Sequence, residues 1–236
     1  MNRDSIKQYL LTDDKEKLLW SEAIIIFDSS ALLDIYFLPK GTRSKIYEEI
    51  FNKLPNRLWL PFHVQYEYLK NRECSITNPI SEKYKPLKEK VKQFEIIGKK
   101  ELLRRIEDIS RESFKDDKHP YIEQTEINAF KGNIEKFLEQ IKSFEEKVLK
   151  QIDEAEKEVT SVKDSDDVLE ALEKFFEVGS EYSFEKILEI TKEGKHRYEF
   201  KIPPGYGDYY KKEKKGTQIF GDLIIWKQIL EFSKEK

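Results

Sequence analysis

Two acidic residues, Asp28 and Asp34, follow a predicted buried strand. Asp28 follows directly after Ala23–Phe27, an apolar, largely β-branched run typical of a strand buried in a parallel sheet. In open α/β sheets ligands bind at the edge where the strands end, so Asp28 is a candidate site residue or, alternatively, the N-cap of the next helix. Asp34 lies inside the next apolar segment, and it is either a second acid at this edge or the partner of an arginine.

Two further acids belong to predicted helices. Glu67 lies in the middle of a helix predicted over residues 62–72, where an acid on the buried side is costly unless it is paired or bound to a metal. His63 and Asn71 lie four residues away on either side and are the alternative partners. Asp222 begins the last apolar helix, where the helix dipole favours an acid whether or not it has another role.

Together these carboxylates indicate a site for hard divalent cations. Mg²⁺ and Mn²⁺ prefer oxygen ligands, and two such ions about 3.5–4 Å apart can activate a water and stabilise the leaving oxygen of a phosphodiester. The sequence has no cluster of cysteine and histidine that would favour zinc, and no glycine-rich phosphate loop that would indicate hydrolysis of nucleoside triphosphates.

The elements that must position these acids alternate between strand and helix. Strands are predicted at residues 23–27 and 57–60, and helices at residues 42–54 and 62–72. This order predicts an α/β fold in which a parallel sheet with right-handed crossovers is flanked by helices.

From about residue 81 to residue 195 the chain is rich in lysine and glutamate, and its apolar residues recur in steps of three and four. Ile127, Phe130, Ile134 and Phe137 are examples, and they predict a long all-helical insertion. The predicted division is therefore a first part of the core at 1–80, the insertion at 81–195 and a second part of the core at 196–236.

Composition limits the setting of the protein. The 236 residues carry a net charge of −3, so a nucleic-acid partner would need a local basic patch rather than a global field. The single cysteine excludes an internal disulfide, and neither a signal peptide nor a membrane-spanning stretch is visible. A cytoplasmic location is expected.

Five sequence blocks occur in order along nearly the whole chain. They are Phe27–Tyr36, Arg57–Pro61, Glu67 with Asn71 and Arg72, Pro203–Tyr206 followed by Asp208 and lysines, and Gly221–Trp226. In this order they resemble the bacterial PIN-like domain family, a branch of the PIN nuclease superfamily with a long helical insertion.

The resemblance implies a metal-dependent nuclease, with RNA as the expected substrate and Mg²⁺ or Mn²⁺ as the cofactor. It implies that Asp28, Glu67 and Asp222 are the metal ligands and that Asp34 supports them. Ser29-Ser30 replaces the Thr-Asn that usually follows the first acid in this family, which alters the groups around the metal.

A second departure concerns the fourth acid, which PIN domains usually supply from a strand after the last helix. The chain ends at Lys236 before such a strand, so we expect a core truncated before its last strand, with a C-terminal domain or a protein partner supplying the remainder. The alternative is a catalytically incomplete PIN-like interaction module whose helical insertion binds a partner protein or domain.

Nucleic-acid contacts are predicted around the Pro-Pro-Gly-Tyr block and at the end of the second helix. Tyr206 could stack on a base, and cationic side chains could hold backbone phosphates. The predicted phosphate contacts are Arg72, Lys211, Lys212, Lys214 and Lys215. For the lysines the alternative is a plain solvated loop.

Overall fold

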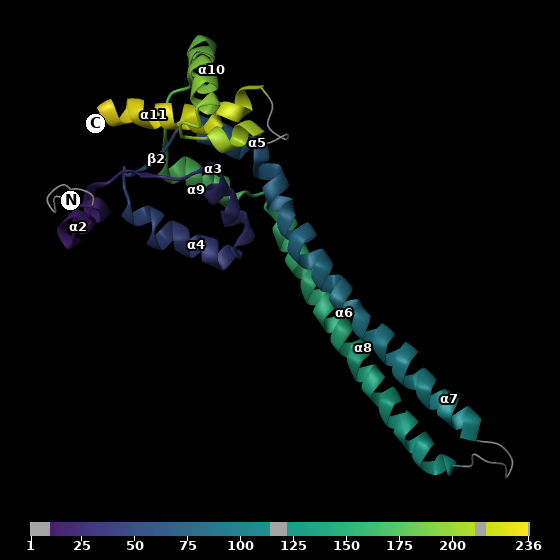
Figure 1. Cartoon of the computed structure of the whole chain (residues 1–236). Coiled ribbons are helices and arrows are strands. Elements are labelled where there is room, and N and C mark those ends of the chain that lie inside the picture. The colour runs from purple at the N-terminus through teal and green to yellow at the C-terminus, as the bar shows by residue number, and fades with distance from the viewer. Residues whose placement is uncertain (1–9, 114–121, 211–215, 236) are drawn as a thin grey trace. The chain divides into compact units, whose positions relative to one another are not determined.

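The structure is a computed structural model that describes residues 10–113, 122–210 and 216–235 (Figure 1). The chain divides into two compact units. The first joins the residues up to Ser75 with those from Asp166 onward, and the second is Ile76–Ser165.

The first unit is built on a parallel three-stranded sheet. Its strands are β1 (Ile25–Ile26), β2 (Leu58–Leu60) and β3 (Glu177–Val178), in the order β1-β2-β3. Ile26 pairs with Trp59, and Trp59 pairs with Glu177 on the other side. All three residues of the central strand β2 are buried, as expected for a strand covered on both faces. The predicted α/β class is confirmed.

Helices and short 3₁₀ turns surround this sheet. The α-helices of the first unit are α2 (Asp13–Glu22), α3 (Ser29–Leu33), α4 (Lys40–Glu49), the larger part of α5 (Phe62–Pro79), α9 (Asp167–Phe175), α10 (Phe184–Glu199) and α11 (Gly221–Glu235). The 3₁₀ turns are η1 (Asp34–Phe37), η2 (Phe51–Lys53), η5 (Tyr206–Tyr210) and η6 (Gly216–Phe220). α9 and α10 begin at capping side chains, Asp166 and Ser183, that accept hydrogen bonds from the first backbone amides of each helix.

Two apolar clusters stabilise the first unit. One joins α10, η6 and α11 through Ile190, Tyr198, Phe220, Leu223 and Ile224, all buried. In the other, the edges of Phe27 and Phe176 contact the ring of Phe51, with centroid distances of 6.0 and 5.2 Å.

These clusters place the boundary of the insertion earlier than the predicted residue 195. Val168, Leu172 and Phe176 of the α9 segment are buried, and so are Ile190 and Tyr198 of α10. Residues 166–195 therefore belong to the first compact unit, although the predicted division places them in the insertion. Their lysines and glutamates are on solvated faces and resemble those of the insertion, so composition alone did not separate the two.

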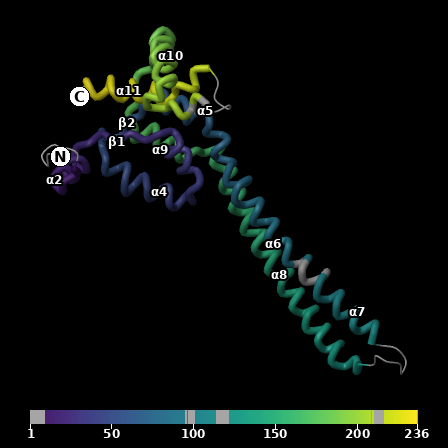
Figure 2. Tube along the Cα trace, viewed as in Figure 1, coloured from purple at the N-terminus to yellow at the C-terminus, as the bar shows by residue number. Residues whose placement is uncertain are grey.

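The second unit is a helical hairpin (Figure 2). One side runs through the end of α5, the π-helical turn η3 (Ile80–Tyr84), α6 (Lys85–Ile97), the π-helical turn η4 (Gly98–Leu103) and α7 (Arg104–Ser113). The other side is the single helix α8 (Gln124–Ser161). Ile106 packs with Ile134 and Leu138 near the connection. At the opposite end, the Lys88 ammonium lies 2.7 Å from both Asp153 and Glu156, so the two sides run antiparallel.

None of the described helices combines the length and the apolar character needed to cross a membrane.

Candidate metal and nucleic-acid site

Glu67 lies on α5 with two polar neighbours at its carboxylate. Ser29 Oγ donates a hydrogen bond to Glu67 Oε2 at 2.8 Å, and this bond joins the start of α3 to α5. His63 Nε2 is 3.7 Å from Glu67 Oε1, one helical turn before it. Of the two predicted alternative partners, only His63 lies near the carboxylate, because Asn71 donates to the backbone carbonyl of Glu67, at 2.9 Å. The hydrogen bond from Ser29 therefore holds the Glu67 carboxylate at the beginning of α3.

The N-terminus of α11 reaches the same carboxylate. A Cβ atom on Gly221 would lie 2.9 Å from Glu67 Oε1 and 3.4 Å from His63 Nε2, so only a residue without a side chain fits without displacing them. Asp222 is the next residue along α11, and it is exposed. The backbone that carries Asp222 is thus in direct contact with Glu67.

The Pro-Pro-Gly-Tyr block approaches Asp222 from the other side. Gly205 has a φ of 83°, a left-handed conformation that favours glycine. A Cβ atom there would lie 2.8 Å from Asp222 Cβ and 2.7 Å from the Tyr198 hydroxyl. This loop therefore packs against the first turn of α11. The contact of Tyr198 with the loop is a feature that no pattern in the sequence indicated.

Asp28 lies at the other end of the Ser29 link. It occupies the N-cap position of α3, yet its side chain makes no capping hydrogen bond. Asp28 Oδ2 accepts a hydrogen bond from Ser30 Oγ at 2.7 Å, and the residue is exposed. Of the two serines that stand where the family usually has Thr-Asn, Ser29 thus binds Glu67 and Ser30 binds Asp28.

The three predicted metal ligands are brought to one region, although they do not surround one point. Ser29 connects the Asp28 segment to Glu67, and Gly221 connects Glu67 to Asp222. Within the described part of the chain, no three acids, histidines or cysteines are close enough to hold a metal ion as they are placed. Asp34 is the exposed first residue of η1, and its supporting role stays a prediction.

Arg72 has a partner inside the protein. Its Nε lies 2.8 Å from Oδ2 of Asp166, a buried residue that also accepts hydrogen bonds from the Tyr36 hydroxyl. Asp166 further accepts from the backbone amides of Val168 and Leu169. The phosphate contact predicted for Arg72 stays a prediction, and the ion pair gives this side chain a structural role.

The pKa values of Tyr36 and Tyr68, the two tyrosines beside this ion pair, are raised. Burial, followed by the hydrogen bond with Tyr68, raises the pKa of Tyr36 far above its usual value. Burial is also the largest cause that raises the pKa of Tyr68. The two hydroxyls are 2.6 Å apart, and the raised pKa values keep both tyrosines neutral beside the contact of Arg72 with Asp166.

The remaining predicted nucleic-acid contacts are partly outside the described residues. Tyr206 begins η5 and is exposed, which leaves its ring accessible. Lys211, Lys212, Lys214 and Lys215 lie outside the described residues.

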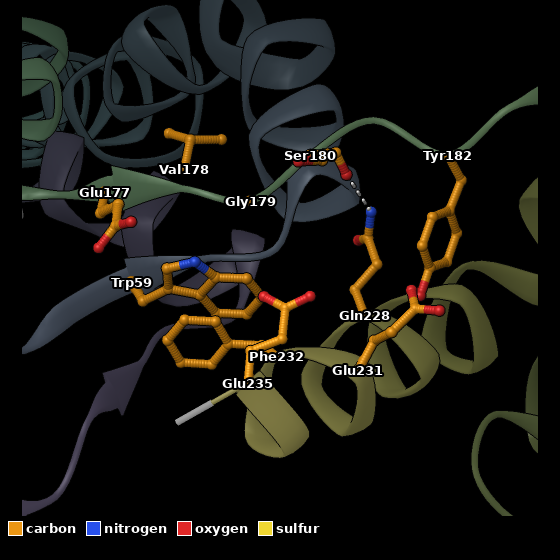
Figure 3. Close-up of a pocket in the computed structure, with 10 residues that line it drawn as sticks. All are labelled: Trp59, Glu177, Val178, Gly179, Ser180, Tyr182, Gln228, Glu231, Phe232 and Glu235. Carbon is orange, nitrogen blue, oxygen red and sulfur yellow. Dashed lines mark hydrogen bonds between the residues drawn. The ribbon is translucent and has the colours of Figure 1, made fainter.

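A separate cavity of about 320 Å³ lies beside β3 and α11 (Figure 3). Trp59 stacks on Phe232 with a centroid distance of 4.0 Å, and Gln228 Nε2 donates to the Ser180 carbonyl at 3.3 Å. The acidic residues that line the cavity are Glu177, Glu231 and Glu235. None of the predicted site residues in the described part of the chain lines this cavity, so it is distinct from the region of Glu67.

With this geometry in place, sequence comparison identifies the family. The family model of the PIN like domain matches residues 24–236, which is most of the chain. The chain therefore belongs to the PIN-like domain family. This membership relates it to the PIN nuclease superfamily, whose domains generally depend on divalent metal ions and commonly bind nucleic acid. No curated protein and no solved structure matches the chain.

Proposed function

We propose that this protein is a metal-dependent nuclease that hydrolyses phosphodiester bonds of RNA. The observation that carries the proposal is the contact of three chain segments at Glu67. Ser29 donates to Glu67 from the segment of Asp28, and Gly221 brings the start of α11, with Asp222, against the same carboxylate. Family membership supports the assignment, because PIN domains generally use divalent metals.

The donor chemistry of these residues fits Mg²⁺ or Mn²⁺. All three proposed ligands, Asp28, Glu67 and Asp222, offer carboxylate oxygens, which hard divalent ions prefer. Such an ion, when bound, supplies a Lewis acid for activating water and for neutralising the leaving oxygen. Ser29 and Ser30 each hold one carboxylate oxygen, of Glu67 and of Asp28, so these two acids already have polar partners where an ion would be held.

The exposed residues around this region give the proposed path for the RNA. Tyr206 is on the loop that packs against Asp222, and an exposed aromatic ring can stack on an unpaired base. The lysines at 211, 212, 214 and 215 come soon after Tyr206 in the sequence and are proposed to hold phosphates.

Titration with Mn²⁺ by calorimetry, followed by an RNA cleavage assay, tests the proposal. The parent chain should bind Mn²⁺, and Asp28→Asn, Glu67→Gln and Asp222→Asn should each lose binding and cleavage while their circular dichroism is unchanged. Glu177→Gln, an exposed acid on β3 outside the region, is the matched control and should bind as the parent does. Equal binding and cleavage in all four variants would refute the assignment.

A further inference from the structure

The helical hairpin carries large apolar side chains on its outside. On α8, Phe130, Phe137 and Phe144 recur at every seventh residue, and each is between 52% and 58% exposed. A helix that needs only to pack against one neighbour has no use for a second apolar stripe, because its remaining faces are in water. The three phenylalanines therefore indicate a surface that another molecule covers.

The opposite side of the hairpin repeats this pattern. Leu87 and Phe94 are seven residues apart, as are Leu102 and Ile109, and all four are between 44% and 52% exposed. Phe94 and Leu102 are eight positions apart, and the π-helical turn η4 (Gly98–Leu103) begins between them and includes Leu102. A π-helical turn accommodates one additional residue, so it keeps the stripe on one side of the helix.

The two stripes meet on the same face of the hairpin. The rings of Phe94 and Phe144 contact each other edge to face, with a centroid distance of 6.2 Å. Phe137 and Phe144 directly precede Leu138 and Glu145, which are buried between the helices. Since the stripes flank the inner seam on both helices and join across it, they form one continuous face. We call it the arm face, and it consists of Leu87, Phe94, Leu102, Ile109, Phe130, Phe137 and Phe144.

The pattern on each helix is that of a four-helix bundle. A two-stranded coil needs apolar residues at two of every seven positions, whereas a bundle helix has a third apolar position beside them. On α8 the inner positions Ile134, Leu138 and Ile141 supply two per heptad, and the phenylalanines supply the third. The hairpin thus has the sequence of half a bundle.

We propose that the arm face binds a second copy of this chain, so that two hairpins form a four-helix bundle. A second copy supplies an identical half, and an apolar face is complementary to itself in a two-fold interface. The seven side chains expose on the order of 600–700 Å² per copy, which is at the lower end of specific interfaces and exceeds the usual largest apolar patch of a monomer. Near the middle of α8 the flanking residues Asn133 and Gln140 are neutral, so self-association brings no like charges together there.

Sedimentation equilibrium of the full chain tests this proposal directly. From about 1 to 100 µM, where an interface of this size associates, the parent should be a dimer. Phe137→Glu should raise the dissociation constant at least roughly tenfold, because it places a charge in the middle of an apolar interface. Phe184→Glu is the matched control, since Phe184 is 66% exposed on α10 in the first unit, and it should stay dimeric.

Far-ultraviolet circular dichroism must show the same helix content in all variants. The residues changed are about half exposed, and glutamate is a good helix former, so the hairpin should remain folded. Phe94→Gln removes the ring that contacts Phe144 without adding a charge, and it should also weaken the dimer. This variant replaces Phe137→Glu as the test if Phe137→Glu lowers the helix content. A parent that stays monomeric overturns the proposal, even if it captures a helix of another protein. A dimer that withstands Phe137→Glu and Phe94→Gln, or that is lost equally in Phe184→Glu, overturns it as well.

Discussion

Gly221 shows how one missing side chain shapes the proposed site. Gly221→Ala would place a Cβ atom 2.9 Å from Glu67 Oε1, and the end of this flexible side chain must move away. We expect the free energy of unfolding to change by less than about 1 kcal/mol, because alanine also favours the helix. The affinity for Mn²⁺ should fall severalfold, since Glu67 is displaced. Calorimetry measures the affinity, and urea unfolding measures the stability.

The control for this substitution is Gly132→Ala on α8. Among the described residues, no atom outside the local helix lies within 4 Å of the added Cβ, so this variant should gain about 0.5–1 kcal/mol of stability. Its Mn²⁺ affinity should equal that of the parent. Undiminished affinity in Gly221→Ala as well would mean that Glu67 is not a metal ligand.

Asp166 is the residue on which the interior polar network depends. Asp166→Ala would remove the acceptor of Arg72 and Tyr36 and the cap of α9 in one step. The lost cap costs about 1 kcal/mol and the lost acceptor of a partly exposed Arg72 and of Tyr36 about 1–2 kcal/mol more, so we expect a loss of about 2–3 kcal/mol in urea unfolding. Asp164→Ala, an exposed neighbour, should stay within about 0.5 kcal/mol of the parent. A loss below about 1 kcal/mol for Asp166→Ala would show that the network contributes little.

The tyrosines of this network predict a dependence on alkaline pH. Folding raises the pKa of Tyr36 and Tyr68, chiefly by burial, so the folded chain keeps protons that the unfolded chain loses above about pH 10. Their contribution to stability is therefore complete below about pH 10 and is lost as the pH rises further. Urea midpoints between about pH 8 and pH 11 measure this decline. Tyr36→Phe should reduce its slope, and an unchanged slope would locate the titration elsewhere.

At the level of single residues, the sequence could indicate the acids but not their partners. The spacing of His63 and Glu67 predicted one contact, which the structure has at 3.7 Å. The Ser29–Glu67 bond and the pairing of Arg72 with Asp166 join residues far apart in the chain, so no local pattern carries them. The ligand roles of Asp28, Glu67 and Asp222 stay predictions.

Among the elements, the sequence predicted those that have a strong local pattern. The β-branched run before Asp28 and the segment around Trp59 became β1 and β2, and the three-and-four spacing of apolar residues became α8. β3 has only two residues, both exposed, and it exists because the backbone of Leu60 and Gly179 pairs beside it. A strand of this kind depends on tertiary contacts and leaves no periodic signal.

The packing of α10 on η6 gives a prediction for this pair of elements. Gly194 lies against the ring of Phe220, and a Cβ atom there would overlap Phe220 Cδ1. Gly194→Ala should therefore destabilise the first unit by about 1–3 kcal/mol, despite the better helix propensity of alanine, because the ring is buried and must shift. Thermal unfolding followed by tyrosine and tryptophan signals of the first unit measures the effect. A stabilised variant would contradict the tight packing of α10.

For the whole molecule, the two units predict two separable properties. The proposed metal ligands and the network of Asp166 belong to the first unit, and the arm face belongs to the second. Ile80 and Thr160 line one cavity at the open end of the hairpin, so a short linker can join the chain there. Replacing residues 82–158 by a few glycines and serines should leave a folded chain that binds Mn²⁺ as the parent does.

The same shortened chain should be a monomer, because it lacks all seven residues of the arm face. Calorimetry and sedimentation equilibrium on this one variant measure both properties. Since the proposed metal site and the arm face consist of different residues, Mn²⁺ binding and dimerisation can be lost independently. A shortened chain that still dimerises places the interface in the first unit, and one that is folded but binds no Mn²⁺ shows that the site depends on the hairpin. Retained binding together with lost dimerisation would establish that the core carries the metal chemistry and that the hairpin carries the association.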